Sequence, residues 1–160
     1  MLKYAFSIEY GGGLPDIKKT PNGKPYFPER RDIHFSLSHS RTHVICALSA
    51  NPVGIDIESP RIISERAIKF FCSPEEQVLF DPLDLWVLKE SYIKLVGGTL
   101  PMIKKLRFSK GSDTIQASDK DVISRLYRIG DCSANACRAA VCSIGGVPPD
   151  SIELITSSID

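Results

Sequence analysis

The sequence has few of the features that mark membrane, secreted or nucleic-acid-binding proteins. No apolar run approaches the roughly 20 residues that a transmembrane helix requires. The first ten residues contain only Lys3 as a cation and are interrupted by Ser7 and Glu9, so we expect no signal peptide there. The 20 basic and 19 acidic residues leave a net charge of +1, which gives no overall field that would recruit nucleic acid or a membrane.

Paired cysteines and a phosphate-binding loop are also missing. The 5 cysteines are odd in number and form no Cys-x-x-Cys pair. Cys46 and Cys142 stand in apolar runs, where cysteine usually behaves as a small buried hydrophobe. We therefore expect reduced thiols in a cytoplasmic protein, with a disulfide between Cys132 and Cys137 as the alternative. No Gly-Lys-Ser/Thr follows Gly11-Gly12-Gly13, so this run predicts a flexible link.

The hydrophobic pattern predicts an α+β fold, because strands and helices are both present without strict alternation. Val53, Ile55 and Ile57 are expected to face the core of one strand, with Gly54, Asp56 and Glu58 on its other face. The first ten residues fit a short helix or a strand. The predicted strands are 33–38, 44–48, 53–58, 104–108, 122–129 and 137–144, the predicted helices are 62–71, one opened by a capping box at 73–76, and 82–96, and a loop is predicted at 110–121.

Acidic side chains recur at spacings that bring them together. Asp56 and Glu58 lie about 6 to 7 Å apart on one strand face. On the helix predicted at 82–96, Trp86, Glu90 and Lys94 share one side. Ordinary solvated acids and a surface i,i+4 ion pair would explain this pattern equally well.

The alternative is a metal site. Asp56, Glu58 and Glu90 would supply three hard oxygen ligands, which suit Mg²⁺ or Mn²⁺ rather than zinc. Such an ion commonly shares a substrate phosphate, and a lysine neutralises the charge that the ion does not reach. Cationic or donor partners nearby in the pattern are Lys24, His39, Lys89 and Lys94.

Four motifs in order resemble the Sfp-type 4′-phosphopantetheinyl transferases. The resemblance is specific from about Lys18 to Gly98 and looser as far as Ile144. The motifs are Gly23-Lys24-Pro25-Tyr26, Phe35-Ser36-Leu37-Ser38-His39-Ser40, Val53-Gly54-Ile55-Asp56-Ile57-Glu58 and Trp86-x-x-Lys89-Glu90-Ser91-x-x-Lys94.

The resemblance implies an enzyme that transfers the 4′-phosphopantetheine arm of coenzyme A to a serine of an apo acyl or peptidyl carrier protein. The reaction requires Mg²⁺ and releases adenosine 3′,5′-bisphosphate. It serves fatty acid, polyketide or nonribosomal peptide biosynthesis. The family fold implied is that of two pseudo-symmetric α/β halves with the coenzyme at their junction.

The resemblance also implies roles for residues. Asp56, Glu58 and Glu90 would hold the metal, and Lys94 with Lys89 would neutralise coenzyme phosphates. Ser38 and His39 would contact phosphates, including the 3′-phosphate, and Lys24 with Pro25 would lie along the nucleotide. Glu90, or a water held by Glu58 or Glu90, would take the proton of the carrier serine, with Glu90 and Lys94 as the catalytic pair.

The sequence departs from the Sfp-type family in its N-terminal part. Residues 1–52 would form a shortened N-terminal half, and residues 53–160 a C-terminal half carrying the metal site in one compact unit. Two other readings stay open: a catalytically impaired homologue that binds carrier protein or nucleotide, and an unrelated Mg²⁺-dependent phosphohydrolase. In the family, the part missing here normally supplies basic residues that contact the 3′-phosphate. The residues that could replace them are Lys18, Lys19, Arg30, Arg31 and Arg41.

Overall fold

The computed structural model describes residues 1–111, 114–119, 121–130, 136–153 and 155. The elements in chain order are α1 (Leu2–Tyr10), β1 (Lys18–Lys19), β2 (Pro25–Tyr26), β3 (His34–His39), β4 (Val44–Ser49), β5 (Val53–Glu58), α2 (Glu65–Phe71), α3 (Pro74–Leu79), α4 (Pro82–Val96), a 3-10 helix η1 (Leu100–Lys104), β6 (Phe108–Lys110), β7 (Ile115–Ala117), β8 (Val122–Ile129) and β9 (Cys137–Ile144). No described helix is both long and apolar enough to cross a bilayer.

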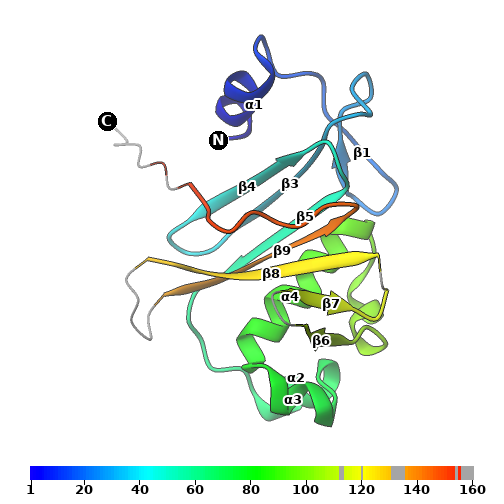
Figure 1. Ribbon diagram of the computed structural model, residues 1–160, viewed down its shortest axis with the longest axis vertical. Coiled ribbons are helices and arrows are strands. Elements are labelled where there is room, and N and C mark those ends of the chain that lie inside the picture. The colour runs from blue at the N-terminus through cyan, green and yellow to red at the C-terminus, as the bar shows by residue number, and fades with distance from the viewer. Residues whose placement is uncertain (112–113, 120, 131–135, 154, 156–160) are drawn as a thin grey trace.

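An antiparallel sheet of five strands, in the order β5-β9-β8-β7-β6, forms the centre of the molecule. Strands β3 and β4 form a separate antiparallel pair, and β3 lies beside β5. Figure 1 shows these strands following one another down the molecule, with α4 behind the sheet and α1 at the opposite end from α2 and α3. The expected mixture of strands and helices is confirmed.

Strands β3 and β5 are joined by serine side chains. The Ile55 amide donates to Ser36 Oγ at 3.1 Å, and the Ile57 amide donates to Ser38 Oγ at 3.3 Å. Both serines are buried. The hydroxyls therefore satisfy amides of β5 that would otherwise lack partners, because a buried N–H without an acceptor is destabilising.

Helix α4 begins and ends where its sequence signals predict. The Asp81 side chain accepts from the Leu83 amide at 2.9 Å, Pro82 occupies the first turn, and Gly97 ends the helix in a left-handed conformation with φ 64°. The absence of a side chain at Gly54 lets α4 lie against β5, since a Cβ there would come within 2.1 Å of the Ser91 carbonyl oxygen.

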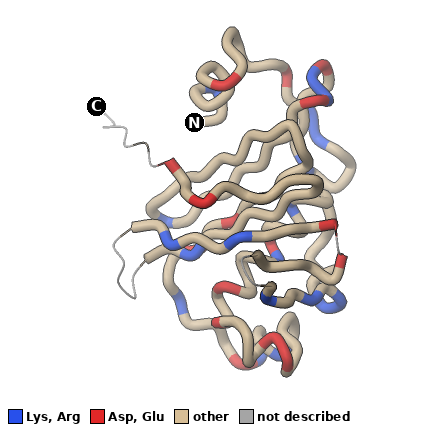
Figure 2. Tube along the Cα trace, in the orientation of Figure 1, with Lys and Arg blue, Asp and Glu red and all other residues tan. Residues whose placement is uncertain are grey.

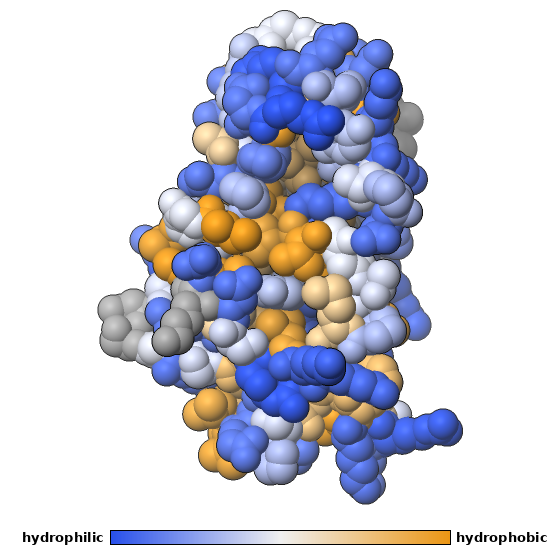
Figure 3. Space-filling model, turned by 90° about the vertical axis from the view of Figure 1, so that its right-hand side faces the viewer, coloured by the Kyte–Doolittle hydropathy of each residue, from blue (hydrophilic) through white to orange (hydrophobic). Residues whose placement is uncertain are grey.

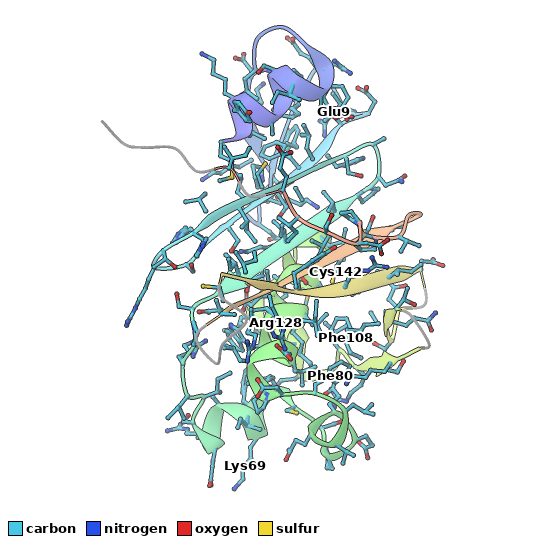
Figure 4. All side chains as sticks on the ribbon, turned by 60° about the vertical axis from the view of Figure 1, so that its left-hand side comes forward. Glu9, Lys69, Phe80, Phe108, Arg128 and Cys142 are labelled. Atoms are coloured by element: carbon cyan, nitrogen blue, oxygen red, sulfur yellow. The ribbon has the colours of Figure 1, made fainter. Side chains whose placement is uncertain are left out.

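The strand face that carries Asp56 and Glu58 is therefore covered by α4. The opposite face of β5 is also covered, because Val53, Ile55 and Ile57 pack in a second apolar cluster. The first cluster lies between α4 and the sheet and extends to Phe80 and to Phe108 of β6, which lie near each other below β8 in Figure 4. A third cluster, centred on Phe6, Phe27 and Phe35, joins α1 to β3.

Most predicted elements are confirmed, including α4, β8, β9 and the Ser73–Glu76 capping box. The first ten residues form a helix. The strand expected at 104–108 was wrong, because η1 occupies its first position and β6 begins only at Phe108. The loop expected at 110–121 was also wrong, because β7 lies within it and pairs with both β6 and β8.

The cysteines of the described residues are free. They are Cys46, Cys72, Cys137 and Cys142. Cys132 lies outside the described residues, so the alternative pairing of Cys132 with Cys137 is not tested.

The surface is uneven in polarity. Figure 3 shows apolar residues gathered at mid-height on one side of the molecule, between hydrophilic regions above and below. At the carboxyl end of α4 and in η1, the exposed large apolar side chains are Val96, Leu100 and Met102.

Candidate active site

Asp56 stands at the centre of a polar network between β3, β5 and α4. Its Oδ1 accepts from Ser38 Oγ at 2.8 Å and from Lys94 Nζ at 2.7 Å. Lys94 Nζ also donates to Ser38 Oγ at 2.8 Å. Asp56 is buried, with 6 % of its surface exposed, so the ion pair with Lys94 is shielded from water on most sides. Three of the sequence-predicted site residues are therefore in contact, because Ser38, Asp56 and Lys94 are hydrogen-bonded to one another.

Glu58, two residues further along β5, is held by a different set. Its Oε1 accepts from the Trp86 indole nitrogen at 3.2 Å and from Arg61 Nη2 at 3.2 Å. The Arg61 guanidinium also lies 5.6 Å from the centre of the Trp86 ring, and Phe71 packs edge-on against that ring. Trp86 thus fixes the position of Glu58 from α4.

Glu90 lies on the same side of α4 as Trp86 and Lys94 and is half-buried. Burial raises the pKa of the Glu90 carboxyl above its ordinary value, and so does the charge of Asp56. Lys94 lowers that pKa, while Glu58 raises it. Because both acids of β5 act on Glu90, the three carboxylates share one electrostatic environment.

The donors suit a hard divalent cation in kind and in charge. Three carboxylates that repel one another are stabilised by a cation with oxygen preference. In the described residues, however, no three His, Cys, Asp or Glu side chains are arranged to hold one ion together. Asp56 instead contacts Lys94, and Glu58 contacts Arg61. The predicted convergence on a single ion therefore stays a proposal.

The structure does not bring Lys89 to this cluster, and the expected phosphate contact needs correction. Lys89 is fully buried on another side of α4. Its Nζ donates to Glu76 Oε2 at 3.0 Å, to the Leu106 carbonyl at 2.9 Å, and to the Phe71 carbonyl. A lysine with this many acceptors joins α2, α3 and the segment after η1 to α4 and has no donor free for a ligand.

Lys24 also has a partner within the chain. Its Nζ donates to the Leu95 carbonyl at the carboxyl end of α4, where a cation complements the helix dipole. Burial lowers the pKa of Lys24. Pro25 pairs with Lys19 in the short β1–β2 ladder. The hairpin is thereby fixed to α4, and the nucleotide contacts expected for Lys24 and Pro25 remain predictions.

Ser38 and His39 end β3 in different surroundings. Ser38 is directed at Asp56 and Lys94, so this geometry gives its hydroxyl a role in positioning these side chains. His39 is exposed at the end of β3, opposite Val44, and its phosphate contact remains a prediction.

A further ion cluster fixes the first turn of α4 and was not anticipated. Buried Asp84 accepts from Arg128 Nη2 at 2.6 Å, and Arg138 Nε lies 3.3 Å from its other oxygen. Arg138 stands opposite Glu58 in the β5–β9 register and opposite Arg128 in the β8–β9 register. The strand predictions could have indicated this row of charges, since directly opposed residues share a face.

Comparison with known proteins agrees with the resemblance in the sequence. Residues 52–140 match the family model described as the 4′-phosphopantetheinyl transferase superfamily. The chain is 42 % identical over 114 residues to 4′-phosphopantetheinyl transferase Sfp of Bacillus subtilis (strain 168), covering 64 % of this chain and 51 % of that protein. It is 38 % identical over 91 residues to 4′-phosphopantetheinyl transferase gsp of Aneurinibacillus migulanus, covering 51 % of this chain and 38 % of that one.

A third relative is a putative 4′-phosphopantetheinyl transferase of Haemophilus influenzae (strain ATCC 51907 / DSM 11121 / KW20 / Rd), 32 % identical over 108 residues that cover 59 % of this chain and 46 % of that one. The chain spans about half the length of the curated relatives it matches, or less. The matched region covers more than half of the chain and contains β5, α4 and the first half of β9, so this chain belongs to the 4′-phosphopantetheinyl transferase superfamily.

Proposed function

We propose that this protein transfers the 4′-phosphopantetheine group of coenzyme A to a serine hydroxyl of an apo acyl or peptidyl carrier protein, with Mg²⁺ as the cofactor and Mn²⁺ as its substitute. The product released is adenosine 3′,5′-bisphosphate. The observation that carries the proposal is the cluster of Asp56, Glu90 and Lys94 at the seam of β3, β5 and α4. The names of the relatives support it independently.

Asp56, Glu58 and Glu90 would hold the ion, which supplies positive charge to the diphosphate of coenzyme A when bound. Lys94 would neutralise the phosphate next to it. This role is consistent with its present contact, because its side chain is 32 % exposed and its ammonium lies beside the carboxylate that would take up the ion. Ser38 would keep Asp56 and Lys94 in place throughout the reaction.

Glu90 is the carboxylate best suited to accept the proton of the carrier serine. Burial and the charge of Asp56 raise the pKa of Glu90 in the ion-free protein, which favours proton uptake by this carboxylate. As the serine oxygen bonds to the β-phosphorus, the bond from that phosphorus to the bridging oxygen breaks. The proton passes to Glu90, and the electron pair leaves with the nucleotide.

The finer features of the family stay part of the proposal. Residues 1–52, with α1 and the β3–β4 pair, would belong to one half of a pseudo-symmetric fold, and residues 53–160 would be the half with the metal site. We place the reaction in the cytoplasm, in fatty acid, polyketide or nonribosomal peptide biosynthesis.

The test is incubation with coenzyme A, Mg²⁺ and a set of apo carrier proteins, followed by intact-mass measurement. A carrier whose mass increases by one phosphopantetheine group supports the proposal. Binding of carrier without a mass increase would favour the impaired homologue. Release of pantetheine phosphate without any carrier would favour a hydrolase.

A further inference from the structure

A recess lined by cations lies between α2 and η1. Its volume is about 450 Å³, and its walls come from α2, from Cys72 after that helix, and from the segment that runs from Lys104 to Arg107. The walls are held from below, since buried Lys89 donates to the carbonyls of Phe71 and Leu106. The recess is thus built on a fixed framework.

Positive charge is concentrated in the lining of this recess. Four of the lining side chains are basic, and no carboxylate is among them: Arg66, Lys69, Lys104 and Arg107. None of the four forms an ion pair with a carboxylate anywhere in the described residues. The chain as a whole has a net charge of +1, so this excess is local. Figure 2 shows both basic and acidic positions in the lower part of the molecule, where Figure 4 labels Lys69.

The guanidinium of Arg107 is held ready for a ligand. Its Nη1 donates to the Lys104 carbonyl at 2.7 Å and to the Leu106 carbonyl at 2.9 Å. Its other nitrogens, Nε and Nη2, have no hydrogen-bond partner in the part of the chain that the structure describes. Lys104 is placed by the Phe70 ring, with Nζ 4.5 Å from the ring centre. A planar guanidinium with two donors side by side matches an oxyanion.

We propose that this recess binds a multiply charged oxyanion, namely the phosphate or diphosphate group of a small molecule. Arg107 would donate to the oxyanion, and Arg66, Lys69 and Lys104 would supply the surrounding charge. A volume of this size is within the range of small-molecule sites, roughly 300 to 1,000 Å³. The site does not depend on the proposed transferase activity, because none of its residues belongs to the carboxylate cluster.

Phe71 lies between the recess and the residues that support the carboxylate cluster. One side of its ring packs against Trp86, whose indole donates to Glu58, and the residue also lines the recess. An anion in the recess would therefore lie one side chain away from the support of Glu58.

The experiment titrates the whole chain with inorganic pyrophosphate in EDTA, so that no divalent ion can bring the anion to the carboxylates. Binding is measured by calorimetry and by amide shifts in NMR spectra. We expect saturable binding, with shifts concentrated at residues 66–72 and 104–107. The double variant Arg66→Gln/Lys104→Gln should weaken binding at least tenfold.

The matched control is Lys3→Gln/Lys110→Gln, which removes the same charge from two exposed lysines, one in α1 and one in β6, that do not line the recess. This control should bind pyrophosphate as the parent does. Arg107→Lys, which keeps the charge but loses the paired donors, should weaken binding several-fold. Retained coenzyme-dependent transfer in these variants would separate this site from the proposed active site.

The proposal would be overturned by the absence of saturable binding, by equal weakening in the Lys3→Gln/Lys110→Gln control, or by shifts confined to β5 and α4. An increase in the KM for carrier protein in the double variant, with pyrophosphate binding unchanged, would also overturn it and would assign the basic surface to an acidic protein partner.

Discussion

Within β3, Ser38 alone contacts both the backbone of β5 and the side chains of the carboxylate cluster. It accepts from the Ile57 amide, accepts from Lys94, and donates to Asp56. Ser36 accepts from the Ile55 amide in the same way, but its hydroxyl contacts no residue of the site. Ser36 therefore has a structural role alone, whereas Ser38 also positions Asp56 and Lys94.

Replacing Ser38 by Ala should lower kcat on the order of 10-fold, about 1.4 kcal/mol, because Asp56 and Lys94 lose their common support. Ser36→Ala should leave kcat near the parent value. Both variants should lose about 1 kcal/mol of unfolding free energy, since each leaves a buried amide without its acceptor. Steady-state kinetics and urea unfolding measure the two effects. An equal loss of kcat in both variants would show that kcat depends on the contact between β3 and β5 and not on the support of Asp56 and Lys94.

The position of Glu90 among other acids serves the site but opposes the stability of the fold. Its pKa is raised in the folded protein, so the folded state favours the protonated carboxyl. That contribution to stability is present below the ordinary pKa of 4.5 and is lost as the pH rises through the higher folded value. Without divalent ions, Glu90→Gln should therefore gain in Tm relative to the parent as the pH rises across this range.

Melting curves in EDTA at a series of pH values test this expectation. Glu29→Gln, a change at an exposed loop position, is the control and should show no such trend. A Tm difference between Glu90→Gln and the parent that does not vary with pH would contradict the shared electrostatic environment of the three acids.

At the scale of elements, the buried ion pair of Lys89 and Glu76 joins helices α3 and α4. Glu76 also accepts from the Ser73 amide through Oε2 and from the Phe108 amide through Oε1. Lys89→Met would leave this carboxylate buried without its cation, and it should destabilise the fold by about 3 to 5 kcal/mol. Urea unfolding measures the loss. A stable Lys89→Met variant that had lost only transfer activity would return Lys89 to the phosphate site.

The contact of β5 with α4 depends on Gly54. Gly54→Ala would place a Cβ 2.1 Å from the Ser91 carbonyl oxygen and 2.3 Å from the Leu95 amide nitrogen, both of them backbone atoms that cannot rotate away. We expect a loss of about 1 to 3 kcal/mol or more, because α4 must move from the sheet. Gly13→Ala is the control, since a Cβ at Gly13 meets nothing within 4 Å. Equal stability of the two variants in thermal unfolding would contradict this packing.

The elements with strong local signals could be predicted from the sequence. Helix α4 has an N-cap, a proline in its first turn and a terminating glycine, and β5 has clear alternation. Strand β7 could not be predicted, because its three residues gain their partners only from β6 and β8. The site was predicted where residues share an element face. It was mispredicted for Lys89, whose ammonium is held by the carbonyls of Phe71 and Ile103, 18 and 14 residues away along the chain.

At the scale of the whole molecule, the site lies where separate parts of the chain meet. β3 contributes Ser38, β5 contributes Asp56 and Glu58, and α4 contributes Glu90 and Lys94. The β1–β2 hairpin contacts the carboxyl end of α4 through Asn22, which donates to the Gly97 carbonyl at 2.9 Å, and through Lys24. The hairpin is therefore attached to the carboxyl end of α4, and the nucleotide contacts of Lys24 and Pro25 stay a proposal.

The central claim is that Asp56, Glu58 and Glu90 together take up one divalent cation. Its most direct test is titration with Mn²⁺ followed by electron paramagnetic resonance, with Asp32→Asn as the control because Asp32 is an exposed acid that pairs with Arg30. The account predicts one saturable Mn²⁺ site in the parent and in Asp32→Asn, displaced by Mg²⁺ and lost in Asp56→Asn. Equal Mn²⁺ binding by Asp56→Asn and the parent would contradict it.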